Sequence, residues 1–211
     1  MPPFLVVLDV DSTLIEDEVI ELIAERAGAR ELVAAVTERA MRGELDFAAS
    51  LRERVATLAG LPVSVLDEVR AEVRVTSGVP ELVAGVHAAG GMIAVVSGGF
   101  HEVLDPIAKD LGLDDWRANR LAVAEGRLTG EVDGPIVDAA AKAAALESWA
   151  AAYDIPLRRT VAIGDGANDL EMMARAGLSI AFDAKPRVRA AAHLVLEVRD
   201  LATVLGVLGL R

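Results

Sequence analysis

The fold expected for this chain follows from one stretch near its start, Phe4-Leu-Val-Val-Leu-Asp-Val-Asp-Ser-Thr13. The first five residues of this stretch are apolar and lack polar alternation, which is typical of a strand buried on both faces of a parallel sheet. Two carboxylates, Asp9 and Asp11, follow that strand directly. Because ligands bind outside the carboxyl ends of strands in open α/β sheets, both are candidate functional residues.

The rest of the chain repeats this strand pattern and alternates it with helical patterns. Further strands are expected at Met92–Val96, Thr160–Ile163, Leu178–Ala181 and His193–Leu196, and helices at Val79–Ala89, Ala139–Ala152 and Leu170–Ala176. Such alternation predicts an α/β fold whose core is a doubly wound, Rossmann-like parallel sheet. A turn at Glu125-Gly126, flanked by Leu121–Ala124 and Arg127–Val132, predicts a small β-hairpin at the edge of that core.

One long stretch between the first two predicted strands contains only helical patterning. The expected helices cover Asp17–Ala27, Ala29–Met41, Phe47–Ala59 and Ser64–Glu72. A connection of this length is too long for a simple crossover between neighbouring strands. We therefore expect residues 15–75 to form an inserted helical cap subdomain over the carboxyl ends of the strands, and residues 1–14 and 76–211 to form the Rossmann-like core.

Composition and charge exclude several classes of protein. The chain has 211 residues, of which 53% are hydrophobic, and a formal net charge of -12. Nucleic-acid phosphates and anionic membranes would repel such a surface, so neither is an expected partner. The absence of cysteine excludes disulfides and thiol catalysis. The apolar runs 4–8 and 201–210 are too short to span a bilayer and no signal-peptide pattern is present, so we expect a soluble, cytoplasmic protein.

A second group of carboxylates ends another predicted strand, in Val161-Ala-Ile-Gly-Asp165-Gly-Ala-Asn168-Asp169. Carboxylates at one edge of a sheet repel each other unless a cation or a proton lies between them, and oxygen ligands suit Mg²⁺. Asp165 and Asp169 could therefore complete a metal site with Asp9. The competing interpretations are solvated aspartates at strand ends, and a role for Asn168 or Asp169 as the cap of the next helix.

Two further features suit an anionic ligand. Ser97-Gly98-Gly99 follows the strand predicted at Met92–Val96, and a hydroxyl before two glycines exposes backbone N–H groups that can bind an anion. Lys142 is one of only three lysines and lies in the first turns of the helix that Asp138 is expected to cap. A cation there opposes the helix dipole, which a bound phosphate would offset. An ordinary glycine-rich loop and a solvated lysine are the alternatives.

These four features resemble the motifs of the haloacid dehalogenase superfamily of phosphatases, in the order Asp9-Val-Asp11-Ser-Thr, Ser97-Gly98-Gly99, Lys142 and Gly164-Asp165-Gly166-Ala-Asn168-Asp169. A closer resemblance, over nearly the whole chain, is to the phosphoserine phosphatases of that superfamily. Its further marks are Asp11-Ser-Thr-Leu-Ile15, Phe47-Ala-Ala-Ser-Leu-Arg-Glu-Arg54-Val, Val95-Val-Ser-Gly-Gly-Phe100 and Ala118-Asn-Arg-Leu121. The resemblance implies a capped hydrolase, a Mg²⁺ cofactor and a small phosphorylated amino acid as substrate.

The resemblance also implies a role for each of these site residues. Asp9 would be the nucleophile that forms an aspartyl-phosphate, and Asp11 would be the general acid and then the general base. Mg²⁺ would be held by Asp9, Asp165 and the backbone carbonyl of Asp11, with Asp169 supporting these ligands from behind. The phosphoryl oxygens would be bound by Ser97, Gly98, Lys142 and Asn168.

By the same resemblance, the cap would select the substrate. Glu18 would pair with the ammonium of the substrate and Arg54 with its carboxylate, because each charge needs an opposite partner once water is excluded. Their rivals are Glu16, Asp17 and Glu21 for the first role and Arg52 for the second. Met41 and Phe47 are candidates for an apolar lining. Ordinary solvated helix charges are the alternative for Glu18 and Arg54.

Other functions stay open on the sequence alone. A related phosphatase could act on phosphoethanolamine, homoserine phosphate or a sugar phosphate. A receiver-like signalling domain also combines N-terminal acidic residues, a strand-end aspartate and a later lysine. The intact set of acidic residues and Lys142 argues against a catalytically silent binding protein. If the cap closes over a substrate, its hinges are expected near Thr13–Glu16 and Val75–Gly78.

Overall fold

The protein is built on a sheet of seven strands in the order β4-β3-β2-β1-β5-β6-β7. The structure is a computed structural model that describes residues 3–41 and 44–210. Its strands are β1 Leu5–Leu8, β2 Met92–Phe100, β3 Asp115–Ala124, β4 Arg127–Asp133, β5 Thr160–Gly164, β6 Leu178–Phe182 and β7 Leu194–Leu196. All neighbours pair in parallel except β3 and β4, which form an antiparallel hairpin. The chain builds one side of β1 and then the other, which confirms the predicted doubly wound α/β fold.

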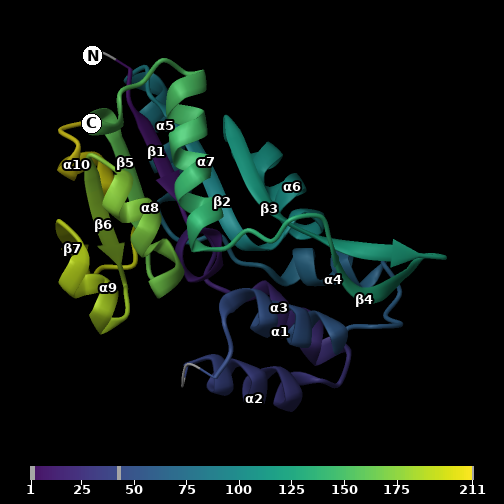
Figure 1. The fold of residues 1–211 in the computed structure, drawn as a ribbon. Helices are drawn as coiled ribbons and strands as arrows, with labels where there is room; N and C mark the ends of the chain where they lie inside the picture. The colour runs from purple at the N-terminus through teal and green to yellow at the C-terminus, as the bar shows by residue number, and fades with distance from the viewer. Residues whose placement is uncertain (1–2, 42–43, 211) are drawn as a thin grey trace.

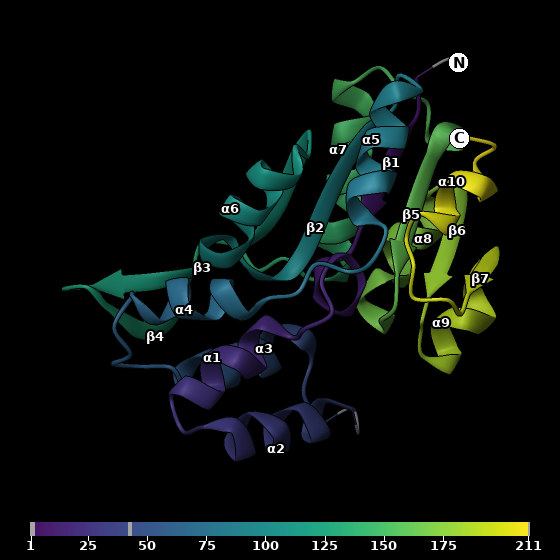
Figure 2. The same cartoon turned by 180° about the vertical axis from the view of Figure 1, so that it is seen from behind.

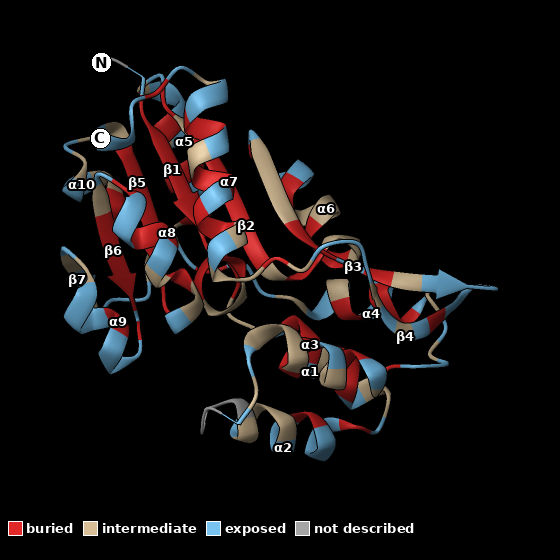
Figure 3. Cartoon of the chain, viewed as in Figure 1, coloured by how far each residue is buried: buried red, intermediate tan, exposed pale blue. Residues whose placement is uncertain are grey.

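Helices cover both faces of the sheet, because the side chains of a strand point alternately to its two faces. The helices of the core are α5 Val79–Ala88, α6 His101–Leu111, α7 Ala139–Ala152, α8 Leu170–Arg175, α9 Pro186–Ala191 and α10 Thr203–Val207. Leu5 and Val7 of β1 pack on the side of α7, α8 and α9 (Figure 1). Val6 and Leu8 pack on the side of α5, α6 and α10 (Figure 2). Figure 3 shows the central strands buried, as their apolar sequences predict.

The helical insertion lies beyond the carboxyl ends of the strands (Figure 1). Its helices are α1 Val19–Arg26, α2 Arg30–Met41, α3 Phe47–Ala56 and α4 Val65–Glu72. The chain enters and leaves this insertion side by side, since Ile15 and Val75 form an antiparallel bridge. Next to that bridge, the N–H of Thr76 donates to the carbonyl of Leu14 at 2.9 Å. The two predicted hinge segments are therefore neighbours in space.

The β3–β4 hairpin makes a second attachment to the insertion, away from the chain crossings. The segment between α3 and α4 runs beside β4, where the N–H of Gly60 donates to the carbonyl of Leu128 at 2.8 Å. The N–H of Leu128 in turn donates to the carbonyl of Leu61 at 2.9 Å. The Arg127 side chain also donates to the carbonyl of Gly60, at 2.6 Å. This pairing covers part of an edge strand whose backbone groups would otherwise lack partners.

Several elements differ from the sequence-based expectation. β2 continues to Phe100, so Ser97-Gly98-Gly99 lies within the end of the strand and not after it. β3 begins at Asp115, well before the predicted hairpin strand, because its mixed polar sequence lacks the apolar run of a central strand. The helices α6, α9 and α10 were not predicted. α6 contains Pro106 in its interior, a residue that argues against a helix, and α9 and α10 are short.

The helices are short compared with the thickness of a membrane. The longest helix of the described residues, α7, has 14 residues. Spanning a bilayer takes about 20 apolar residues in a helix. Within residues 3–41 and 44–210, no helix has the length and apolar character for such a span.

Candidate active site

Asp9 and Asp11 lie where β1 ends and the chain turns back on itself. The turn is η1 (Val10–Leu14), whose interior is not helical, since Asp11 is extended and Ser12 has a left-handed φ of 59°. The Asp9 carboxylate accepts a hydrogen bond from the N–H of Val10 at 2.7 Å. The strand ends at Leu8, before the pair, so the η1 turn and not strand alternation sets the directions of the Asp9 and Asp11 side chains. Both carboxylates line one cavity, but from different surroundings.

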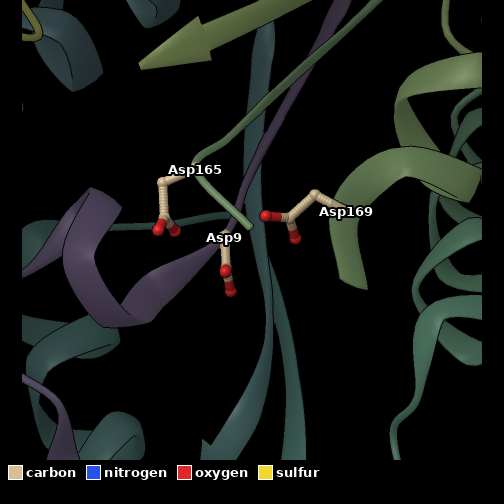
Figure 4. A group of neighbouring side chains, drawn as sticks. All are labelled: Asp9, Asp165 and Asp169. Carbon is tan, nitrogen blue, oxygen red and sulfur yellow. The ribbon is translucent and has the colours of Figure 1, made fainter. Parts of the chain in front are cut away.

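Asp9 belongs to a cluster of three buried carboxylates (Figure 4). Carboxylate oxygens of Asp9, Asp165 and Asp169 lie within 4.8 Å of one another. Lys142 contacts two of these carboxylates, so negative charge stays in excess of positive charge. Oxygen ligands with such an excess suit a hard divalent cation. The cluster therefore fits a divalent metal, as the sequence predicted.

Lys142 reaches this cluster from α7, the helix that Asp138 caps by accepting from the N–H of Ala141. The Lys142 side chain is fully buried. Its Nζ donates to Asp9 Oδ1 at 2.6 Å and to Asp169 Oδ1 at 2.8 Å. The two carboxylates offset the unfavourable helix dipole and the burial of the charge. A solvated lysine, the alternative interpretation, is wrong.

Asp169 is held from two sides. Besides Lys142, its carboxylate accepts a hydrogen bond from the N–H of Gly166 at 3.0 Å. Although Asp169 precedes α8, its side chain does not cap that helix. Asn168 does not cap α8 either, and it lines the cavity. The capping alternative is therefore wrong for Asn168, whereas the bond from the N–H of Gly166 to Asp169 is a capping-box contact at the start of the short helix η3 (Ala167–Asp169), which precedes α8.

Burial and mutual repulsion raise the proton affinity of the cluster. Desolvation raises the pKa of Asp9 well above its ordinary value, and Asp169 and Asp165 add to the shift while Lys142 opposes it. Desolvation and Asp169 raise the pKa of Asp165 to about 6. Burial alone would lower the pKa of the Lys142 ammonium, but Asp169 and Asp9 outweigh burial and raise it. A cation would therefore bind this cluster in competition with protons.

Asp11 lies in a different environment, between the end of β2 and the helical insertion, which we call the cap. Its Oδ1 accepts a hydrogen bond from the N–H of Val19 at 3.0 Å, and its Oδ2 accepts from the hydroxyl of Ser97 at 3.2 Å. Burial, with a contribution from the Glu18 charge, raises the pKa of Asp11 to about 7. A carboxyl that keeps its proton near neutral pH can act as a general acid.

The end of β2 brings backbone close to both Asp11 and the cap. A Cβ on Gly99 would lie 2.8 Å from Asp11 Oδ2, and a Cβ on Gly98 would lie 2.8 Å from the ring of Phe47. The N–H of Gly99 donates to the Ser97 hydroxyl oxygen at 2.7 Å, which leaves that hydroxyl free to donate to Asp11. The two glycines thus leave room for the Asp11 carboxylate and the Phe47 ring, and they lie within the end of a strand and not in a loop.

A cavity of about 970 Å³ opens over these residues and has walls from both the core and the cap. On the core side it is lined by Asp9, Asp11, Gly98, Gly99, Ala139, Asp165, Gly166, Ala167, Asn168, Lys185 and Arg187. On the cap side it is lined by Glu18, Ile20, Glu21, Thr37, Leu45, Phe47, Ser50, Leu51 and Arg54. The volume is ample for a small ligand and water. For Met41 the structure describes the backbone but not the side chain, so its predicted role in the lining stays a prediction.

The cap brings opposite charges to this cavity. Glu18 precedes α1 and accepts a hydrogen bond from the Ser12 hydroxyl at 2.8 Å. Arg54 on α3 is half-buried, and burial lowers the pKa of its guanidinium while Glu18, Asp11 and Glu21 oppose that shift. A cation and an anion of the cap are therefore both near Asp11, which is where a zwitterionic group would find partners.

Most rivals of these two residues point elsewhere. Glu16 and Asp17 pair with Arg74, at 3.1 Å and 2.9 Å, beside the place where the chain leaves the cap. Arg52 is exposed and does not line the cavity, as expected for a residue two positions from Arg54 on a helix. Glu21 does line the cavity and remains an alternative to Glu18.

The sequence analysis overlooked two cations of the cavity wall, Lys185 and Arg187. They follow β6, and the N–H of Lys185 donates to the carbonyl of Asp165 at 3.1 Å. The charge of Lys185 opposes the rise in the pKa of Asp165. Both cations follow the strand predicted at Leu178–Ala181, just as Asp9 and Asp165 follow their strands, so their position in the sequence could have identified them.

The family model of the haloacid dehalogenase-like hydrolases matches residues 6–174. The chain belongs to this family. The matched range contains Asp9, Asp11, Ser97, Lys142 and Asp165, the residues that carried the resemblance in the sequence. The predicted superfamily is therefore confirmed.

The chain is also similar to individual members of this family that are named phosphoserine phosphatases. The chain is 58% identical over 98% of its length to a phosphoserine phosphatase from Streptomyces coelicolor, of which it covers 50%. It is 49% identical over 95% of its length to the phosphoserine phosphatase of Lactococcus lactis, of which it covers 93%. A solved phospho-aspartyl intermediate analogue of phosphoserine phosphatase has a TM-score of 0.92 and 42% identity, over 98% of this chain and 99% of that one. The chain thus spans half of the first relative and nearly all of the other two.

Proposed function

We propose that this chain is a Mg²⁺-dependent phosphomonoesterase that hydrolyses O-phospho-L-serine to L-serine and phosphate through an aspartyl-phosphate on Asp9. The observation that carries the proposal is the setting of Asp9, which is buried at the end of β1 and hydrogen-bonded to Lys142 at 2.6 Å. Asp165 and Asp169 lie beside it. The Lactococcus lactis relative and the solved intermediate analogue support the same reaction.

Two carboxylates share the chemistry in this proposal. An oxygen of Asp9 attacks the phosphorus, and the serine oxygen leaves with the proton that Asp11 donates. In the second step Asp11 takes a proton from water, the water oxygen attacks the phosphorus, and the bond between phosphorus and Asp9 breaks. The pKa of Asp11, raised to about 7 by burial and by Glu18, supports both roles near neutral pH.

The phosphoryl oxygens need cationic and N–H or O–H partners while negative charge spreads over them. We assign this role to Ser97, Gly98, Lys142 and Asn168. Gly98 and Asn168 line the cavity, which supports direct contact with a phosphoryl group. Lys142 and Ser97 are buried outside that lining and donate to Asp9 and Asp11, so their assignment rests on these two bonds and on the family resemblance.

The acidic cluster would hold Mg²⁺ through Asp9, Asp165 and the backbone carbonyl of Asp11. When bound, Mg²⁺ would offset the excess carboxylate charge and polarise the phosphoryl oxygens. Asp169 fits a supporting role, because its oxygens already accept from Lys142 and from a backbone N–H. The choice of Mg²⁺ among divalent cations rests on the family resemblance.

Substrate selection is assigned to the cap. Arg54 would bind the carboxylate of phosphoserine and Glu18 its ammonium, since both line the cavity near Asp11. We propose that residues 15–75 are the cap and that residues 1–14 and 76–211 are the core. Hinges near Thr13–Glu16 and Val75–Gly78 would let the cap open for substrate and close against water. The cytoplasmic location and the absence of nucleic-acid and membrane partners stay predictions from the sequence.

A panel of phosphate esters assayed with Mg²⁺ tests the proposed function. The panel contains O-phospho-L-serine, phosphoethanolamine, homoserine phosphate and a sugar phosphate. Phosphoserine is expected to give the highest kcat/KM, with many turnovers per chain and with reversible loss of activity on chelation. Preference for another ester would correct the substrate. Phosphorylation once per chain without turnover would favour the receiver-like alternative, which the family assignment already disfavours.

A further inference from the structure

Asn119 is a fully buried polar residue of β3 that lies outside the cavity, at 1% exposure. It lies at the end of an irregular stretch of β2: Val96 pairs with Arg117 and Phe100 pairs with Asn119, so Ser97-Gly98-Gly99 faces the single residue Ala118 of β3. Bulges of this kind are frequent beside active sites, where they aim a side chain. The bulged segment is the one that holds Asp11 and is assigned to phosphoryl binding.

The Asn119 amide uses both of its ends. Its Nδ2 donates to the carbonyl of Gly98 at 2.8 Å, and its Oδ1 accepts from the N–H of Val137 at 2.8 Å. A carbonyl can only accept and a backbone N–H can only donate, so this orientation of the amide is the one that satisfies both partners. An asparagine side chain supplies a donor group and an acceptor in fixed relative positions, which neither an ionised aspartate nor a leucine does.

On the first side, Asn119 controls a peptide plane that leads to Asp11. The carbonyl of Gly98 and the N–H of Gly99 belong to one planar peptide unit and point in opposite directions. Asn119 holds the carbonyl, and the Ser97 hydroxyl oxygen accepts from the N–H at 2.7 Å. That hydroxyl then donates to Asp11 Oδ2 at 3.2 Å. Rotation of this plane would break the bond from the Gly99 N–H to the Ser97 hydroxyl. It would thereby alter the position of the hydroxyl that donates to Asp11, the proposed general acid.

On the second side, Asn119 leads to Lys142. Val137 directly precedes Asp138, the residue that caps α7, and Lys142 follows in the second turn with its N–H donating to the carbonyl of Asp138 at 2.9 Å. The N–H of Val137 has Asn119 as its buried partner. One amide therefore joins the loop that contacts Asp11 to the start of the helix that carries Lys142.

We propose that Asn119 is a positioning residue for the phosphoryl-transfer reaction: it fixes the Gly98–Gly99 peptide, and through it Ser97, relative to the helix of Lys142. The inference rests on the proposed function and adds a residue that contacts neither substrate nor metal. Removal of the amide would leave two buried backbone groups without hydrogen-bond partners, which destabilises the local structure. We expect kcat to fall as a result, because phosphoryl transfer depends on the placement of charged groups.

The test compares Asn119→Asp and Asn119→Ala with the wild type, after the ester panel has identified the best substrate. A carboxylate cannot donate to the Gly98 carbonyl, whereas a protonated carboxyl can. We expect kcat to fall about tenfold or more in both variants near pH 8, with a smaller change in KM. Towards lower pH, the ratio of kcat in Asn119→Asp to kcat in Asn119→Ala should rise. His101 and Glu102 of α6 accept from the neighbouring amides of Ala118 and Leu121, and both residues are present in the two variants, so the ratio reports on the side chain at position 119.

Ser179→Ala is the matched control for a purely structural loss. Ser179 is as buried as Asn119, and its hydroxyl oxygen accepts from the N–H of His193 at 3.1 Å, at the far edge of the sheet between β6 and β7. This variant should lower Tm and leave kcat unchanged. If an Asn119 variant does not fold, Asn119→Ser replaces it, because a hydroxyl is too short to make both bonds.

Two results would overturn the inference: folded Asn119 variants with kcat within about twofold of the wild type, or a ratio of the two variants that does not change with pH. The proposed function fails separately, in the wild type, if phosphoserine is not hydrolysed. In that event the same variants are compared on whichever ester the panel selects.

Discussion

The floor of the cavity and its cap wall hold their charged groups in opposite ways. On the floor, Lys142 is fully buried and its Nζ lies 2.6 Å and 2.8 Å from the oxygens of two buried carboxylates. On the cap wall, Glu18 is exposed and accepts from a Ser12 hydroxyl, and Arg54 is half-buried with its Nε donating to a backbone carbonyl at 3.3 Å. The floor is a closed network, whereas the wall keeps charge available for a ligand.

This difference suggests a division of roles, in which the floor of the cavity serves the reaction and the cap wall serves the choice of substrate. Buried charges are stable only when each has a partner in good geometry, so the floor is preorganised and intolerant of change. Charges at a partly open wall have lost less hydration, so they can be exchanged at little cost to the fold. We therefore expect changes on the floor to remove turnover and changes on the wall to alter the choice of ester.

The largest effect is expected from Asp9→Asn. An amide cannot form the acyl phosphate, so turnover should fall by roughly 10⁴-fold or more. The amide keeps the size of the carboxylate, so the chain should still fold by circular dichroism. Asp154→Asn, at an exposed position with a left-handed φ of 54°, is the matched control and should keep full activity. Substantial turnover by Asp9→Asn would refute the mechanism.

Lys142→Ala should combine a kinetic with a thermodynamic loss. The substitution leaves Asp9 and Asp169 without their buried ammonium, a change that costs about 3–5 kcal/mol when a buried pair is broken. Denaturant unfolding measures this loss, and steady-state assays should show kcat reduced by about 10²-fold or more. The exposed Lys109 provides the control Lys109→Ala. Equal stability of the two variants would contradict the network described for the floor.

Arg54→Ala should act on selectivity. Loss of a charged partner for the substrate carboxylate should lower kcat/KM for phosphoserine by about 10²-fold, with far less effect on phosphoethanolamine, which lacks that carboxylate. Arg52→Ala, two residues away on the same helix and outside the cavity, should match the wild type. An equal loss of kcat/KM on both esters would show that Arg54 acts in the reaction and not in the choice of substrate.

The smallest effect is a pH-dependent stabilisation by the cation. Burial raises the pKa of Asp165 to about 6 and that of Asp11 to about 7, whereas both lie at about 4 in an unfolded chain. Because folding raises these pKa values, the metal-free fold is most stable with both groups protonated and loses stability as pH rises from about 4 to about 7. Mg²⁺ should therefore raise Tm by a few degrees near pH 8 and hardly at all near pH 5.

Thermal unfolding with and without Mg²⁺ at the two pH values checks this expectation. Asp165→Asn removes a carboxyl whose pKa is raised and which is a proposed metal ligand. This variant should therefore lose most of the increase in Tm that Mg²⁺ causes near pH 8. The same increase in Tm at both pH values would show that the cation does not compete with protons at the cluster.

The fold could be predicted from the sequence wherever burial is complete. β1 is a continuous apolar run, β5 and β6 are mostly apolar without polar alternation, and the insertion between the first two strands shows only helical patterning. The pattern fails where an element is half covered or its interactions are distant in sequence. β3 carries Arg117 and Asn119, whose partners lie on other elements, and α6 has a proline in its interior.

The site could be predicted from strand ends, but its contacts could not. The order of Asp9, Ser97, Lys142 and Asp165 along the chain suffices for the family, because parallel strands bring their carboxyl ends together. The different surroundings of Asp9 and Asp11 come from the η1 turn, which strand periodicity does not describe. The role inferred for Asn119 depends on two hydrogen bonds to residues 21 and 18 positions away, which no local pattern contains.

The most direct test is to locate the phosphoryl group during turnover. The enzyme is mixed with phosphoserine and Mg²⁺, quenched in acid within the first turnovers, digested and analysed by mass spectrometry. The account predicts a labile phosphoryl group on Asp9, absent from Asp9→Asn. A phosphoryl group on Asp11, Asp165 or any other residue, or continuous turnover with no modified Asp9, would contradict it.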